Sequence, residues 1–212
     1  MRTAKSRSYR MGKRAELVDQ TRRRITEAAV RLHTSVGPSA TSMTAVAEEA
    51  GVTRLTLYRH FPNGDLLFAA CMSHWRAQHP PPDPDAWRSV QPFGVRVRRA
   101  VADVYRWYEQ NAADLYPLYR DAAFTPQSTL AARKATIERM VDAILDGATV
   151  RGRAKGRLRA LAGHALGFWT WWSLHDEQGL RGADLVEVAT AVILAGADSE
   201  LTETESTSPA SK

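Results

Sequence analysis

The sequence predicts an all-α protein. Residues that favour helices, chiefly Ala, Leu, Arg and Glu, dominate the 212-residue chain. Apolar residues recur at spacings of three and four, and no segment shows the alternation expected of a half-buried strand. An apolar content of 44% is enough to build a core rather than a disordered chain. We therefore expect a protein made of helices, divided into two domains.

Several classes of protein are disfavoured by the composition. A single cysteine, Cys71, cannot form an intramolecular disulfide. No apolar run reaches the ~18 residues of a membrane span. The basic N-terminus is not followed by the apolar stretch of a secretory signal. These features predict a cytoplasmic protein without a membrane partner.

The positive charge is concentrated near the N-terminus. Residues 1–35 carry ten Lys or Arg and three acids, a net 10 − 3 = +7. Residues 36–80 carry three of each sign, and residues 81–212 carry 16 basic and 17 acidic residues, a net −1. Such a patch is typical of a protein with a polyanionic partner. A basic tail that only aids solubility is the alternative.

The segment 41–67 predicts two short helices joined by a tight turn, then the start of a third. Ser42 and Thr53 are suited to accept hydrogen bonds from unpaired amides at helix starts. Gly51 supplies the left-handed residue that ends a helix at low steric cost. Pro62 disfavours helical geometry at the preceding residue, so the second helix should be short. The pattern is that of a helix-turn-helix, whose second helix enters the major groove of DNA.

The outward face of that second helix is the expected DNA contact. Its side chains can donate hydrogen bonds and none is acidic, which suits phosphates and base acceptors. The residues expected to meet base edges are Thr53, Arg54 and Thr56. Those expected to meet phosphates are Ser42, Thr44, Tyr58, Arg59 and His60, with Arg22 and Arg24 of the first helix adding charge. An ordinary solvated helix face is the alternative.

Residues 47–61, AEEAGVTRLTLYRHF, resemble the signature of the tetracycline-repressor (TetR) family of one-component transcriptional regulators. The resemblance covers about Val18 to Leu67. Leu55 replaces a residue that is often small in that family, and Gly64 replaces a lysine that often reaches a phosphate. The resemblance implies a homodimer formed by the two C-terminal helices, here residues 154–175 and 183–197, which presents two recognition helices to duplex DNA.

The remaining sequence predicts the domain organisation. Proline-rich residues 80–84 form a stiff spacer, which places the main boundary at residue 79. The expected parts are a basic, mobile arm (1–15), a DNA-binding domain with a connecting helix (16–78), an effector-binding and dimerisation domain (79–197) and a disordered tail (198–212). Within the DNA-binding domain, residues 16–35 should be helical with a buried stripe of Val18, Ile25, Ala28, Ala29 and Leu32. In the C-terminal domain, helices are expected at 92–111, 115–123, 130–145, 154–175 and 183–197.

Aromatic residues concentrate in the C-terminal domain, where walls of aromatic side chains with a few polar tips are typical of a small-molecule pocket. The expected effector cavity is formed by Tyr105, Tyr108, Tyr119, Phe124, His164, Phe168 and Trp172. Packing of a helical core is the alternative for each of them, and His164 is then a core histidine. Gly163 and Gly167 predict a close approach of another helix.

No arrangement of residues predicts catalysis, a metal site or a cofactor. Cys71 and His74 have a spacing that permits thiol activation, but a third orienting group is not evident. Gly-rich phosphate loops and nucleophile elbows do not occur. The sequence thus predicts a ligand-responsive repressor that binds a palindromic DNA operator as a homodimer. A helical ligand-binding protein or enzyme with a vestigial helix-turn-helix, and a non-specific nucleic-acid packaging protein, are the alternatives.

Overall fold

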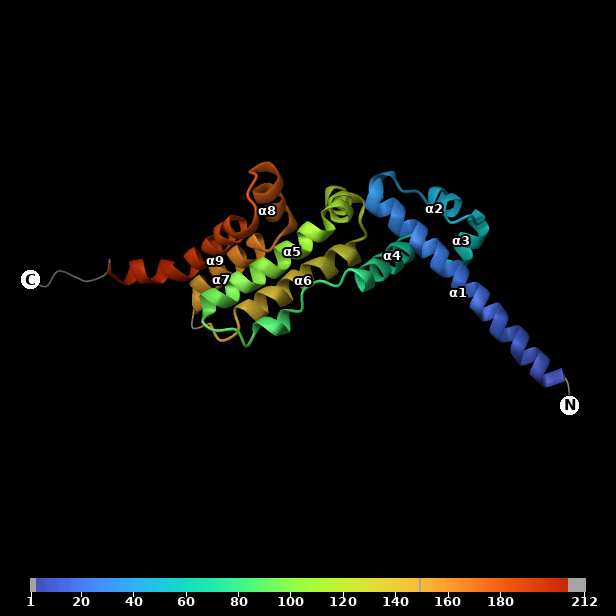
Figure 1. The fold of residues 1–212 in the computed structure, drawn as a ribbon, viewed down its shortest axis with the longest axis horizontal. Coiled ribbons are helices and arrows are strands. Elements are labelled where there is room, and N and C mark those ends of the chain that lie inside the picture. Colours follow the sequence, from blue (N-terminus) through green and yellow to red (C-terminus); the bar gives the residue numbers. More distant parts are fainter. Residues whose placement is uncertain (1–2, 149, 206–212) are drawn as a thin grey trace, which may run out of the picture. The chain divides into compact units, whose positions relative to one another are not determined.

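The computed structural model describes residues 3–148 and 150–205, and it describes side chains at 13–148 and 150–196. All regular structure in these residues is helical, as predicted (Figure 1). The α-helices are α1 (Thr3–Ser35), α2 (Met43–Glu49), α3 (Arg54–His60), α4 (Gly64–Gln78), α5 (Phe93–Arg120), α6 (Gln127–Ile144), α7 (Gly152–Ala165), α8 (Phe168–Trp172) and α9 (Gly182–Glu205). The short turns are η1 (Pro38–Ala40), η2 (Pro84–Trp87), η3 (Ala122–Phe124) and the π-helical η4 (Ser173–Glu177). No described helix is long and apolar enough to cross a membrane.

The chain divides into two compact units. The first, here called the head, comprises Met1–Pro80 and Ala112–Leu130. The second, the body, comprises Pro81–Asn111 and Ala131–Lys212. The chain passes from the head to the body after Pro80, and the last turns of α5 and the start of α6 belong to the head. The domain bounds expected from the sequence stay a prediction.

In the head, α1 packs against α4 and α2, and α2 packs against α3. Figure 1 shows α4 lying along the second half of α1. Ile25 and Ala28 of α1 are fully buried with Leu57 of α3 and Phe61. Complete burial of such side chains is worth about 1.5–3 kcal/mol each, so the short helix α3 is held mainly by tertiary packing.

Helix α1 is longer than the sequence predicts. It begins at Thr3, so the mobile arm expected at 1–15 is helical from that residue. Residues 13–20 are all exposed, and Val18, expected inside, is 46% exposed. The physical reason is that α2–α4 cover only the second half of α1, which leaves the side chains of residues 13–20 exposed.

Helix α5 is continuous through Pro117, although one helix over 92–111 and a separate, shorter one over 115–123, interrupted by Pro117, were expected. Proline removes one backbone hydrogen bond and crowds the preceding turn. Leu115 and Leu118 on either side of Pro117 are 4% and 0% exposed, so packing of this last part of the helix outweighs the local cost.

In the body, α7 and α9 form the most extensive helix pair. Their close approach occurs at Gly196, where a Cβ atom would lie 2.6 Å from Leu161 Cδ1 and 3.5 Å from Leu158 Cα. Gly196 therefore has the packing role that the sequence assigned to Gly163 and Gly167. A Cβ atom on Gly163 would make only an ordinary contact, at 3.9 Å from Val141.

The single helix expected over 154–175 is instead three elements. Helix α7 ends at Ala165, and α8 and η4 follow after a break at Gly167, whose backbone is extended (φ −71°, ψ 144°). A Cβ atom at Gly167 would lie 3.0 Å from the carbonyl oxygen of His164, so the break favours glycine. At the C-terminus, α9 continues to Glu205, where a disordered tail was expected from residue 198, and the rest of that tail lies outside the described residues.

Candidate nucleic-acid interface

The helix-turn-helix begins with the two caps that the sequence predicts. Ser42 Oγ accepts a hydrogen bond from Ala45 N at 3.1 Å, and Thr53 Oγ1 accepts one from Thr56 N at 3.2 Å. Gly51 lies between the two helices in the left-handed region, with φ 62°. These local interactions fix the turn. The two caps pair with backbone amides that the helix starts leave without a partner, and Gly51 adopts the left-handed conformation that ends the first helix.

Helix α3 has one buried and one exposed face. Leu57 and the capping residue Phe61 are fully buried. Arg54, Tyr58 and Arg59 are exposed. Thr56 is half-buried, and its hydroxyl oxygen accepts a hydrogen bond from the Thr53 hydroxyl at 3.0 Å. The predicted DNA-contacting residues of α3 therefore share an accessible face, on which no acidic side chain lies.

The exposed face also carries one apolar residue, Leu55, which is 80% exposed. It is one of the two positions, with Gly64, at which the sequence departs from the resembled family. An apolar side chain among donors can contact the methyl group of thymine in the major groove. Leu55 is not among the contacts that the sequence predicts, because its side chain cannot form hydrogen bonds.

Arg22 of α1 supports the end of α3. Its Nη1 donates a hydrogen bond to the carbonyl oxygen of His60 at 2.9 Å, and its guanidinium carbon lies 4.2 Å from the centroid of the Phe61 ring. A cation at a helix C-terminus is favourable because the last carbonyl groups carry partial negative charge. The sequence predicts Arg22 only as a source of positive charge, and the structure gives it this positioning contact as well.

The charge on His60 is affected by the same neighbours. Burial of the imidazole, followed by the positive charges of Arg59 and Arg22, lowers the pKa of His60 below its ordinary value. A neutral imidazole can still donate one hydrogen bond to a phosphate. The other predicted phosphate contacts are Ser42, which is exposed, and Thr44, which is half-buried; Arg24, predicted to add charge, is exposed.

The helix-turn-helix is also held by residues that sequence patterns do not reveal. Arg31 Nε of α1 and Glu49 Oε1 of α2 form an ion pair at 2.8 Å. The Trp75 indole donates to Asp114 Oδ2 at 2.7 Å, and Asp121 accepts from Ser39. These pairs join residues 18 to 82 positions apart, so no local motif could identify them.

The residues predicted to form an effector cavity are divided between the two units. Tyr119 and Phe124 belong to the head, and the other five to the body. In the body, the hydroxyls of Tyr105 and Tyr108 donate to the carbonyl oxygens of Ala165 and Leu166, at 2.7 and 3.0 Å. Both hydroxyls thus pair with backbone groups at the end of α7.

An aromatic cluster lies beside these tyrosines. The Phe168 ring packs edge-on against Tyr108 with centroids 5.4 Å apart, and the Trp172 ring lies 5.9 Å from Phe168. His164 is exposed, although an apolar environment was expected. Helix α7 ends one residue later, at Ala165, and the carbonyl oxygen of His164 accepts a hydrogen bond from Thr170 Oγ1 at 2.7 Å. The sequence did not single out Trp171 and His175, whose rings stack at 4.8 Å.

Two features of the body bear on ligand binding. Trp171 Nε1 and His175 Nδ1 are buried without a hydrogen-bond partner among the described residues. A hollow of about 360 Å³ is lined by Arg98, Tyr105, Arg106 and Glu109 of α5 and by Leu185 of α9. Tyr105 is the one member of the predicted set that lines it. No group of three potential metal ligands occurs in the described part of the chain.

Comparison with known proteins agrees with this geometry. Residues 25–71 match the model of a family described as "Bacterial regulatory proteins, tetR family". No curated protein matches the chain. The fold resembles a tetR-family transcriptional regulator from Streptomyces coelicolor, with 19% identity, a TM-score of 0.55 and coverage of 84% of this chain and 79% of the other.

A TetR-family transcriptional regulator from Haemophilus influenzae is also similar, at 18% identity and a TM-score of 0.47, over 84% of this chain and 94% of the other. The match of residues 25–71 spans α2, α3 and the parts of α1 and α4 that pack on them, which is the helix-turn-helix described above. The helix-turn-helix segment of this chain is thus similar to that of the tetR family of bacterial regulatory proteins.

Proposed function

We propose that the protein is a dimeric repressor that binds an inverted-repeat operator in the cytoplasm and releases it when a small-molecule effector binds. The observation that carries the proposal is the two-sided character of α3. Leu57 and Phe61 fix the helix in the head, while Arg54 and Tyr58 remain exposed.

Contacts with DNA divide by position along α3. Thr53, Arg54 and Thr56, at the N-terminal end, are proposed to meet base edges, as the first residues of a recognition helix do. Tyr58, Arg59 and His60 are proposed to meet phosphates with Ser42 and Thr44. Arg22 and Arg24 add positive charge, and each neutralised phosphate releases counterions, so affinity should fall steeply with salt.

A homodimer through α7 and α9 is supported by an apolar stripe on α9. Val188 and Val192 are 40% and 39% exposed, and Ala191 between them is exposed too. Spacings of three and four place the three side chains on one face of the helix. A two-fold axis through this stripe would bury it against its own copy and present two α3 helices to successive turns of DNA.

The dimer can be tested directly by the substitution Val188→Glu, measured by analytical ultracentrifugation. The proposal expects the wild-type chain to sediment as a dimer and Val188→Glu to shift it toward monomer, because the stripe cannot bury an unpaired carboxylate. Val18→Glu is the matched control, since Val18 is similarly exposed at 46% but lies on α1. Equal dimerisation of all three chains would contradict this interface.

The effector is proposed to bind in the body near the predicted residues Tyr105, Tyr108, Phe168 and Trp172. Two observations support a site there: the hollow that Tyr105 lines, and the unpartnered nitrogens of Trp171 and His175. A buried donor without a partner costs about 1–3 kcal/mol, which a ligand acceptor would offset. The effector releases DNA only if it prefers the conformer whose two α3 helices do not match the grooves.

Selection of bound sequences from a random DNA pool tests the proposed operator. The proposal expects enrichment of an inverted repeat whose half-sites are centred one helical turn apart, about 34–36 Å. Enrichment of a single unrepeated site would contradict the dimeric operator. Recovery without any sequence preference would favour a packaging protein, and loss of salt-sensitive DNA binding altogether would favour a ligand-binding protein with a vestigial head.

A further inference from the structure

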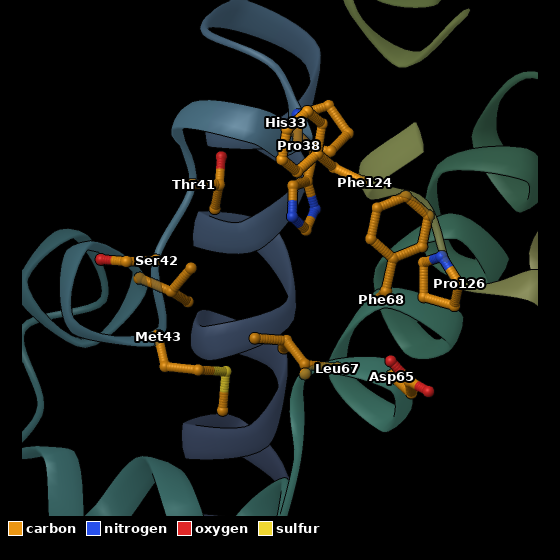
Figure 2. A pocket seen from close by; sticks show the side chains of 12 residues that line it. His33, Pro38, Thr41, Ser42, Met43, Asp65, Leu67, Phe68, Phe124 and Pro126 are labelled. Carbon is orange, nitrogen blue, oxygen red and sulfur yellow. The ribbon is translucent and has the colours of Figure 1, made fainter. Parts of the chain in front are cut away.

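A second hollow lies in the head, beneath the helix-turn-helix (Figure 2). Its volume is about 150 Å³, and α1, α2, α4 and the segment around η3 all contribute to its wall. Figure 2 shows the side chains of Met43 from α2, Leu67 and Phe68 from α4, and His33 from α1 around it. Phe124, which the sequence assigned to an effector cavity, lines this hollow and is 66% exposed.

Most of the wall is apolar or aromatic, and its one acidic side chain among the described residues is Asp65, so it favours a flat molecule without negative charge. His33 lies 7% exposed with its ring 4.6 Å from that of Phe68, and its Nδ1 is 3.3 Å from Cys71 Sγ. Burial lowers the pKa of His33 to about 4, so the imidazole is neutral at pH 7. Aromatic rings and the thioether of Met43 offer favourable contacts to another ring.

Three polar side chains, Thr41, Ser42 and Asp65, also line the hollow, and each can pair with a hydroxyl group of a ligand. The Ser42 hydroxyl accepts a hydrogen bond from Ala45 N, which leaves its proton free to be donated. Ser42 lines the hollow beside Met43. A cavity of about 150 Å³ in another protein holds a benzene molecule, so this hollow has room for a single ring.

The geometry points to a binding site in the head for a small neutral aromatic molecule that carries one hydroxyl group, separate from the effector site proposed in the body. An occupant would contact Met43 of α2 and Leu67 of α4 at once and so fix the spacing of these two helices. Both helices begin at the hollow, α2 at Met43 after its cap Ser42 and α4 at Gly64, next to the proposed DNA surface. Occupancy should therefore change the affinity for DNA by the same factor by which the affinity for the small molecule differs between free and DNA-bound protein.

Phenol is the probe, and isothermal titration calorimetry with the full chain is the measurement. Gly64 allows a clean blocking variant, because a Cβ atom there meets nothing within 4 Å and Gly64 lines the hollow. We expect Gly64→Leu to weaken phenol binding at least about tenfold. Gly156→Leu is the matched control, since Gly156 lies on α7 in the body and an added Cβ atom there also meets nothing within 4 Å. The affinity of Gly156→Leu for phenol should stay within about twofold of that of the wild type.

Methyl NMR locates the phenol independently of affinity and of DNA. The Met43 methyl signal should shift on titration, while that of Met140, buried in the body, stays unchanged. Shifts confined to Met140, or equal affinity in wild type and Gly64→Leu, would overturn the site, as would the absence of saturable binding. Because neither measurement uses DNA or dimerisation, its failure would leave the proposed repressor function standing, and failure of operator selection would leave this site standing.

Discussion

The carboxylate of Asp121 accepts two hydrogen bonds from Ser39, one from the backbone nitrogen at 3.0 Å and one from the hydroxyl at 2.5 Å. Arg120 Nε lies 2.8 Å from Asp121 Oδ1, and its Nη2 donates to the carbonyl oxygen of Val36 at 2.9 Å. Gly37 faces the pair with φ 95°, and a Cβ atom there would lie 2.3 Å from Asp121 Oδ2. The end of α5 thus holds the turn that leads from α1 into the helix-turn-helix.

Loss of this carboxylate should loosen the turn. We predict that Asp121→Ala lowers the free energy of unfolding by about 2 kcal/mol, because hydrogen bonds to a charged group are lost and the amide of Ser39 is left unpaired. Arg120 and Ser39 hold the pKa of Asp121 well below its usual range, so the contribution is present above pH ~4 and is lost as the pH falls through the lowered pKa. Urea denaturation at pH 7 measures the free energy of unfolding of Asp121→Ala, and Asp19→Ala, at an exposed position on α1, is the control. A change no larger than the control's would refute the role of Asp121.

A second pH effect arises from His33. Burial lowers the pKa of His33 to about 4, whereas an unfolded histidine has a pKa near 6.5. Between these values the unfolded chain binds more protons, so stability falls as the pH drops from about 6.5 to 4, by up to about 1.4 kcal/mol per pH unit. We predict that His33→Leu flattens this part of the stability curve measured by urea titration between pH 7 and 5. An equally steep curve in His33→Leu would show that other groups cause the loss.

Arg22 is expected to act on stability as well as on DNA. Arg22→Ala removes the hydrogen bond to the His60 carbonyl and the contact with the Phe61 ring, and should cost about 1 kcal/mol in thermal unfolding. Arg24→Ala removes the same charge from an exposed neighbour and serves as the control. If both variants unfold like the wild type while both weaken DNA binding, Arg22 contributes charge alone.

The first half of α1 offers a test of the basic patch. Lys13 and Arg14 are exposed on the part of α1 that α2–α4 do not cover. If they meet phosphates that flank the operator, Lys13→Gln with Arg14→Gln should reduce the slope of log affinity against log salt by about 1–2, with little change in sequence preference. Lys155→Gln with Arg157→Gln, two exposed cations of α7, is the control. An unchanged slope would place this part of α1 away from DNA.

The sequence predicts the local chemistry of the interface well. The caps at Ser42 and Thr53, the left-handed Gly51 and the end of the connecting helix α4 at Gln78 are confirmed. Each depends on interactions within a few residues, for which residue type and spacing are sufficient.

The remaining features depend on distant contacts. Helix α5 runs through Pro117 because the residues on either side of the proline are buried. Gly167 ends a helix that the apolar periodicity predicts to continue, and the close contact of α7 with α9 occurs at Gly196. Periodicity shows that a helix has a buried face but not which helix covers it. For the same reason the sequence could not foresee that Asp121 would meet Ser39, or that Tyr119 and Phe124 would fall in the head.

The central claim is that the exposed face of α3 reads DNA, and a titration of the selected operator in a gel-shift assay tests it most directly. The account predicts that Arg54→Ala with Tyr58→Ala weakens operator binding at least about a hundredfold, because a base contact and a phosphate contact are lost together. Arg157→Ala on α7, which removes one exposed cation from the body, should bind as the wild type does. Unchanged operator affinity in the double variant, at low and at physiological salt, would contradict the account.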